Sequence, residues 1–234
     1  MDGSAFFLDV IKALIGSFVG AWLAFFANWL VRQYQREEDR VAAGNLAIVT
    51  LGRMINAFLI YKQQVVQTRV ETINASPNLP IWMQMRPIFH EFDETLSIDF
   101  ESLTFLFHPQ THDAMNHLLI AQGKYRNLVG LHKAHFKDML ELQEKISEMS
   151  GANQQQDINI DLAMKRVPAY LQGRIESTNI GLVAALENDE KPMIEALREL
   201  ERSIGSILGR SRLVRISIPE KLLTSEKSAV LFKG

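Results

Sequence analysis

The pattern of apolar and polar residues divides the chain into an unbroken apolar segment near the N-terminus and a long remainder with helical periodicity. Residues 13–31 contain no charged side chain, and their only polar members are Ser17 and Asn28. As an α-helix the segment is about 28 Å long, at about 1.5 Å per residue, which matches the hydrocarbon thickness of a bilayer. Helices in the core of soluble proteins are rarely this long without a charge. We therefore predict a transmembrane helix over residues 13–31, rather than a buried helix of a soluble bundle.

The residues that flank this segment predict its orientation. Lys12 is the only basic residue that precedes it, whereas three arginines follow it closely, namely Arg32, Arg36 and Arg40. Cytoplasmic flanks of membrane helices carry the excess of basic residues, so the N-terminus is expected outside and the rest in the cytoplasm. A cleaved signal peptide would have a basic start, which residues 1–12 lack. The prediction is a single-pass protein of the inner membrane in which residues 1–12 form a short extracytoplasmic leader.

One face of the predicted span consists of small residues and one Asn at a spacing of four: Gly16, Ser17, Gly20, Ala21, Ala24 and Asn28. Such rows allow two membrane helices to approach closely, and an Asn can add a hydrogen bond between them. We therefore predict that the span self-associates and that the protein is a homo-oligomer in the lipid bilayer. Asp9 and Lys12, three residues apart near the outer interface, are the intramembrane polar candidates, either pairing or reaching toward the headgroups.

Residues 32–215 are predicted to form a cytoplasmic bundle of long helices. The first helix is expected to continue without a break from about residue 5 to about residue 73, because apolar residues recur at helical spacing after the span. A second long helix is predicted over residues 111–149, and a turn at residues 188–192 separates and caps two further helices. The run at residues 213–218 is the one strand candidate and is too isolated for a sheet. The predicted fold class is all-α.

The second long helix carries the most regular apolar pattern in the chain. Its apolar positions alternate spacings of three and four, which is a heptad seam typical of coiled-coil packing. The seam residues are Leu118, Tyr125, Val129, His132, Phe136, Met139 and Ile146. Polar residues interrupt it, so we expect packing that is either imperfect or specific for one register.

An irregular segment with several prolines precedes this helix and combines aromatic with acidic residues. We predict short helical turns that pack over the bundle and expose an acidic face. The alternative is a binding loop for a cytosolic protein, because loops that carry aromatic and acidic side chains often meet partners. The residues of this candidate partner loop are Trp82, Phe89, Glu91, Phe92, Asp93 and Glu94.

Basic residues predominate at the C-terminal end. Six lysines and arginines stand against two glutamates from Arg210 onward. Such a tail is able to contact anionic lipid or an acidic partner. More often it is a solvated end, and we predict a basic, partly flexible tail over residues 216–234.

Composition and motifs argue against most enzymes. The net charge of −2 does not favour a nucleic-acid-binding protein, and the lack of cysteine excludes disulfides, thiolate zinc sites and cysteine nucleophiles. The sequence contains no phosphate-binding P-loop, no GxGxxG and no GxSxG motif. The stretch HEFDE at His90 resembles part of a zinc-protease motif but has Glu94 where the second histidine is required. The prediction is a non-enzymatic protein without a metal or other cofactor.

The remaining histidines fall into two groups along the chain. Three of them lie within ten residues, namely His108, His112 and His117, and His132 and His135 are three residues apart on the second long helix. We interpret all of them as surface or seam histidines, although imidazoles titrate near neutral pH and a pH-sensing role stays open.

Three functions are compatible with these features. The first is a membrane-tethered interaction module that self-associates. The second is a membrane-perturbing or pore-forming effector of a bacterial antiphage or toxin system, which its cytoplasmic bundle holds in check. The third is an enzyme or ligand sensor that uses the acidic-aromatic loop and the histidines. We rank them in this order.

Overall fold

A computed structural model describes residues 3–76, 79–107, 111–150 and 166–218. The regular elements in these residues are all helical, which confirms the predicted fold class. Four are α-helices: α1 (Gly3–Ala75), α2 (His112–Ser150), α4 (Ala169–Asn188) and α5 (Glu190–Leu208). Three are short 3-10 helices: η1 (Ile81–Met83), η2 (Thr104–Leu106) and η3 (Arg210–Arg212). No strand occurs among the described residues, and residues 213–218 are accordingly not a strand.

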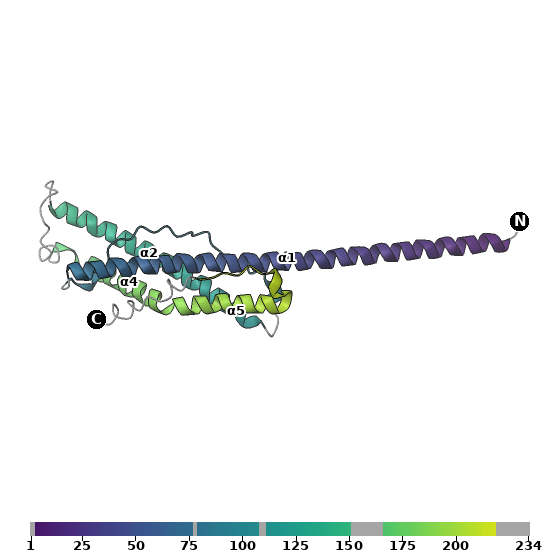
Figure 1. Cartoon of the computed structure of the whole chain (residues 1–234). Helices are drawn as coiled ribbons and strands as arrows, with labels where there is room; N and C mark the ends of the chain where they lie inside the picture. Colours follow the sequence, from purple (N-terminus) through teal and green to yellow (C-terminus); the bar gives the residue numbers. More distant parts are fainter. Residues whose placement is uncertain (1–2, 77–78, 108–110, 151–165, 219–234) are drawn as a thin grey trace.

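The helix α1 is 73 residues long and without interruption, as predicted. Its C-terminal half lies beside α2 and α5, whereas its N-terminal half extends alone far beyond them (Figure 1). We call the packed part, from about residue 41 onward, the helical body.

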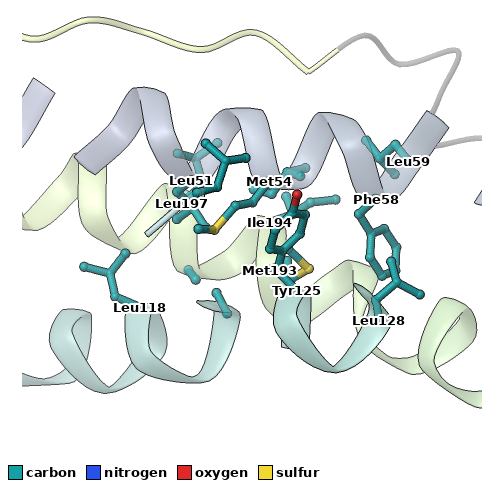
Figure 2. Close-up of a cluster of buried hydrophobic side chains, with 14 of the residues drawn as sticks. Leu51, Met54, Phe58, Leu59, Leu118, Tyr125, Leu128, Met193, Ile194 and Leu197 are labelled. Carbon is teal, nitrogen blue, oxygen red and sulfur yellow. The ribbon is translucent and has the colours of Figure 1, made fainter. Parts of the chain in front are cut away.

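The main hydrophobic core joins the C-terminal half of α1 to α2 and α5 (Figure 2). It also includes the end of α4. Leu51 and Phe58 of α1, Leu118 and Leu128 of α2 and Leu200 of α5 are at most 1% exposed. Burying a side chain of this size is worth about 1.5–3 kcal/mol. Many such contacts, rather than helix propensity, hold the body together.

Two glycines of α1 allow close approach at the end of the body nearest to the exposed half. A Cβ atom at Gly44 would lie 3.0 Å from Ile204 of α5, and one at Gly52 would lie 2.2 Å from Ile216. The segment that contains Ile216 lies on α1 and is held by Asn45. The Asn45 side chain accepts a hydrogen bond from Val214 N–H (2.9 Å) and donates one to the Arg212 carbonyl (3.1 Å).

A second, smaller core lies at the opposite end of the body. Its buried residues are Trp82, Leu142, Val167, Leu171 and Ile175. Trp82 is 5% exposed and packs in this core with residues of α4, so it is not available to a partner. For Trp82 the packing of the segment over the bundle describes the position better than the alternative of a binding loop, because its large apolar area is buried.

Residues of the predicted seam of α2 pack in the main core along the first part of the helix and in the second core farther along. Leu118, Tyr125 and Val129 are buried in the main core, and His132 is buried beside it. Farther along, Phe136 is half-buried, and Met139 and Ile146 pack against the second core. The helix thus changes partners along its length.

Two ion pairs secure the turn between α4 and α5. Lys62 of α1 pairs with Glu190, and Lys124 of α2 pairs with Asp189. The turn lies within the predicted stretch but is shorter, because α5 already begins at Glu190. Asp189 makes no side-chain capping bond to α5. Its carboxylate instead forms the ion pair with Lys124 of α2. The predicted tail begins with packed residues, because Ile216 and Ile218 contact the main core, and residues 219–234 lie outside the described part of the chain.

Candidate functional site

The exposed half of α1 is the most unusual surface of the molecule. Every described side chain from residue 14 to residue 31 is exposed, among them Phe18 (74%), Trp22 (58%) and Phe25 (72%). This is the one helix in the described part of the chain that is long and apolar enough to cross a membrane, and none of its most apolar stretch is buried against the rest of the chain. An apolar surface of this extent needs lipid or other protein chains as its neighbour.

Two opposite sides of this helix differ in the size of their side chains. On one side Trp22, Phe26 and Trp29 stack in sequence, with ring centroids 5.7 and 5.8 Å apart. With 3.6 residues per turn, the predicted small-residue face lies on the other side. A Cβ atom at Gly16 or Gly20 would meet no atom within 4 Å, so this face is open.

The other members of the predicted face are exposed as well: Ser17, Ala21, Ala24 and Asn28. Of the two polar residues near the N-terminus, Lys12 is exposed. The Asp9 backbone is part of α1, and its side chain lies outside the described part.

The candidate partner loop lies over α1 and α2, and its backbone is held by side chains of the body. Tyr125 donates a hydrogen bond to the Asp93 carbonyl (3.1 Å), and Arg53 forms an ion pair with the Asp93 carboxylate (3.1 Å). Gln122, a polar interruption of the seam, accepts a buried hydrogen bond from Ile98 N–H (2.7 Å). Gln122 and Tyr125 of α2 therefore both hold the segment that precedes this helix.

Beneath the loop, imidazole and aromatic rings form a cluster. Phe92 lies against His90, with centroids 4.4 Å apart, and Tyr61 of α1 lies against His132 of α2 at 5.0 Å. The Tyr61 hydroxyl is 3.2 Å from His132 Nδ1, and His90 Nδ1 is 3.1 Å from the Gln64 amide oxygen. The cluster thus joins the loop, α1 and α2.

Burial determines the protonation of this cluster. It lowers the pKa of His90, and it lowers the pKa of His132, where the neighbouring His90 and His135 act in the same direction. Burial also lowers the pKa of His135 and raises the pKa of the Tyr61 hydroxyl. At neutral pH these imidazoles are therefore uncharged, and Tyr61 is suited to donate its proton to His132 Nδ1.

A small cavity of about 330 Å³ opens beside these rings, and His90, Phe92 and His132 are among its lining residues. Its rim carries the exposed ion pair between Glu94 and Lys133. In the part of the chain that the structure describes, no group of three or more His, Asp or Glu residues is placed to hold a metal ion. The cavity has neither a serine nor a cysteine in its lining.

The other residues of the candidate partner loop are distributed between surface and interior. Phe89 is 83% exposed, Glu91 and Glu94 are exposed, and Phe92 and Asp93 are half-buried. Phe89 also packs edge-on against Phe136 of the seam, with centroids 5.3 Å apart. The surface that a partner would meet is therefore acidic with one exposed aromatic ring.

The histidines also differ in their exposure to solvent. His132 and His135 are buried, and His117 is exposed. The side chains of His108 and His112 lie outside the described part of the structure. The contact between His90 and His132 was not predicted, since the two lie far apart in sequence and no periodicity relates them.

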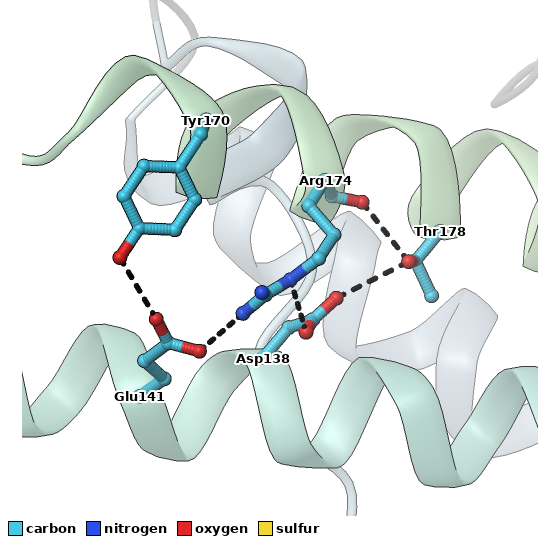
Figure 3. Close-up of polar contacts among 5 residues, drawn as sticks. All are labelled: Asp138, Glu141, Tyr170, Arg174 and Thr178. Carbon is cyan, nitrogen blue, oxygen red and sulfur yellow. Dashed lines mark hydrogen bonds and ion pairs between the residues drawn. The ribbon is translucent and has the colours of Figure 1, made fainter.

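A polar network between α2 and α4 was also not predicted (Figure 3). Arg174 of α4 pairs with Asp138 (2.7 Å) and with Glu141, both on α2. Tyr170 donates to Glu141 (3.2 Å), and Thr178 donates to Asp138 (3.3 Å). Every member has its partner within the network, so it aligns two helices rather than offering a free reactive group.

The chain matches no protein-family model, no curated protein and no solved structure in the comparisons with known proteins. The geometry of the molecule is thus the only basis for a function.

Proposed function

We propose that this chain is a non-enzymatic, single-pass membrane protein that acts through self-association and protein–protein contacts at the cytoplasmic face of the inner membrane. One observation carries the proposal: a single uninterrupted helix runs from an exposed apolar stretch into the core of a packed helical body. Such a helix is a rigid link between the bilayer and the body. Residues 13–31 would span the membrane and residues 32–215 would form the cytoplasmic bundle.

The open small-residue face supports self-association of the span. Gly16 and Gly20 leave room for the backbone of a second helix, and Asn28 offers a hydrogen bond across the contact. The aromatic stack on the opposite side, around Trp22 and Phe26, would face lipid. Joining two spans would also bring two helical bodies together and raise their avidity for a partner.

The exposed part of the loop supports a cytosolic protein as the partner. Phe89 supplies an exposed ring, and two exposed glutamates lie on the same loop, namely Glu91 and the ion-paired Glu94. Aromatic residues are enriched in protein interfaces. A basic surface with an apolar pocket is the complementary chemistry. The proposal includes no catalysis, metal, cofactor or nucleic acid.

Fractionation tests the anchor. Membranes washed at high salt without detergent should retain the chain, and detergent should release it. Recovery in the aqueous phase would contradict anchoring. Because the sequence has no cysteine, single Cys variants report the sidedness cleanly: an impermeant maleimide on intact spheroplasts should label Ser4→Cys but not Ser147→Cys. The reverse labelling would contradict the proposed orientation.

Substitution of the small residues tests self-association. The double variant Gly16→Ile/Gly20→Ile should shift the detergent-solubilised chain toward the monomer in analytical ultracentrifugation. The matched control, Phe18→Ile/Phe25→Ile, keeps an apolar span but changes the other side of the helix, and should sediment like the wild type. A wild-type chain that is monomeric in detergent and in bilayers would contradict the proposal.

The continuity of α1 also favours a second candidate, a membrane-perturbing effector of an antiphage or toxin system. Because span and body share one helix, loosening the body would free the span to rearrange. A body-destabilising variant such as Leu51→Ala should then depolarise cells that carry a membrane-potential dye. Unchanged potential and growth at equal expression would exclude this candidate and leave the anchored interaction protein.

A further inference from the structure

The end of the body nearest to the exposed half of α1 contains a groove rich in arginine. It has a volume of about 580 Å³. Arg198 and Arg202 reach it from α5, Arg210 from η3 and Arg215 from the extended segment that follows. Glu201 is the one carboxylate among its lining residues.

Within the described part of the chain, most of this positive charge is not paired with a carboxylate. Arg202 pairs with Glu199 (2.5 Å), and its side chain is 67% exposed, so this pair is weak and easily exchanged. Arg198, Arg210 and Arg215 are exposed, and in the described part of the chain none of them forms an ion pair. Glu201 is engaged by the Ile216 N–H group (3.3 Å).

We propose that this groove binds a multiply charged, phosphate-bearing anion. Guanidinium groups bind phosphate oxygens through two parallel hydrogen bonds, and several of them around one groove match an anion with more than one phosphate. The volume lies within the usual range of small-ligand pockets. An anion would also relieve the repulsion among arginines that the fold brings together.

The position of the groove along α1 favours a soluble anion over a lipid headgroup. The groove-lining Val214 and Ile216 meet α1 at Asn45 and Gly52. These residues lie about 21 Å and about 32 Å beyond Val31 along the helix, at about 1.5 Å per residue. Headgroups extend only about 5–8 Å beyond the hydrocarbon core. A groove at this height would face the cytosol.

Binding there would act on the attachment of α1. An anion held between Arg198 and Arg215 joins α5 to the extended segment. That segment is bound to α1 through Asn45. The ligand would therefore stabilise the junction between the helical body and the exposed half of α1.

Thermal unfolding of the full-length chain tests the proposal in two arms. In nonionic detergent, inorganic tripolyphosphate should raise the melting temperature, with inorganic phosphate much weaker. In nanodiscs without added anion, phosphatidylglycerol is compared with phosphatidylcholine. The groove variant Arg198→Gln/Arg215→Gln should weaken tripolyphosphate binding at least tenfold. The control Arg126→Gln/Arg166→Gln removes two exposed arginines elsewhere and should change it less than twofold.

The outcomes separate the two sources of phosphate. Stabilisation by tripolyphosphate that depends on Arg198 and Arg215 supports the soluble ligand. Stabilisation only by phosphatidylglycerol, with the same dependence, supports the phosphate chemistry and assigns it to headgroups. No stabilisation in either arm, or equal losses in the groove and control variants, overturns the proposal. The detergent arm requires no membrane anchoring, so this failure is distinguishable from failure of the proposed function.

Discussion

The two halves of α1 have the same backbone but opposite surroundings. From residue 14 to residue 40 every described side chain is exposed, whereas from Ala47 to Val65 buried and exposed positions alternate with the turn of the helix. A helix that is apolar on all sides suits a uniform apolar environment, and one with a single apolar stripe suits a protein core. The hydrophobic pattern, rather than helix propensity, thus decides what each half contacts.

A short charged stretch separates these two environments. Residues 32–40 are polar or charged except for Tyr34, and all are exposed. The body contacts this stretch where Glu37 pairs with Arg212 of η3 (2.7 Å). The charged stretch therefore ends where the body begins.

Placing charge in the first half should have the largest effect. Two arginines at the centre of the span, Leu23→Arg/Phe26→Arg, would oppose membrane insertion by about 5–7 kcal/mol. We expect the chain to leave the membrane fraction in a detergent-free fractionation. The control Leu46→Arg/Val49→Arg places the same charges at the same spacing on exposed positions of the second half and should stay in the membrane. Equal retention of both variants would remove the distinction between the halves.

A cavity in the second half should have the next largest effect. Leu51 is fully buried, so Leu51→Ala should lower the free energy of unfolding of the body by about 2–5 kcal/mol. Denaturant unfolding followed by circular dichroism in detergent measures it, and membrane retention should not change. Leu46→Ala, on the exposed side of the same helix, is the control and should lie within about 0.5 kcal/mol of the wild type. Similar losses for both would mean that this half is not a packed stripe.

The sequence predicted the long helices well because their signals are local. Helix α1 ends at Ala75, just before Pro77, and α2 spans His112–Ser150 where residues 111–149 were predicted. Apolar periodicity and proline determine such boundaries within the segment itself. The apolar stretch of α1 that is long enough to span a membrane was likewise recognised from composition alone.

Contacts between segments that lie far apart in the chain could not be predicted from the sequence. His90 meets His132, and Asn45 holds the segment at Val214, without any pattern that relates these positions. The arginine groove was missed for the same reason, because its side chains come from α5, η3 and the segment after it. Periodicity shows which side of a helix is apolar but not which element covers it. The burial of Trp82 was missed because the residues that cover it, among them Leu171 and Ile175, lie far away in the sequence.

Replacing one glycine in each half of α1 should give smaller effects, and the two replacements should change different properties. Gly52→Leu would collide with Ile216 and should destabilise the body by about 1–3 kcal/mol, without changing self-association. Gly20→Leu meets open space within the chain, so it should leave unfolding unchanged and weaken the proposed helix–helix contact in the membrane. Paired unfolding and sedimentation measurements compare the two variants. If both variants changed the same property, the two halves would share one environment.

The smallest expected effect is a pH dependence confined to the body, because residues 13–31 contain no titratable side chain. Burial lowers the pKa values of His90, His132 and His135 in the folded chain. An imidazole with a lowered pKa stays neutral in the fold but takes up a proton in the unfolded chain below about pH 6.5. Stability is therefore complete above about pH 6.5 and declines as the pH falls from there toward the lowered pKa values.

The decline should be visible as a lower denaturant midpoint at pH 5.5 than at pH 7.5. His132 is the best position to alter, since Tyr61 of α1, His90 of the loop and His135 of α2 all face it and none supplies a negative charge at these pH values. His132→Gln keeps a hydrogen-bonding side chain beside Tyr61 but cannot titrate, so it should flatten the pH profile. His117→Gln, at an exposed position of the same helix, should not. Equal slopes in both variants would show that the buried cluster does not govern the stability of the body.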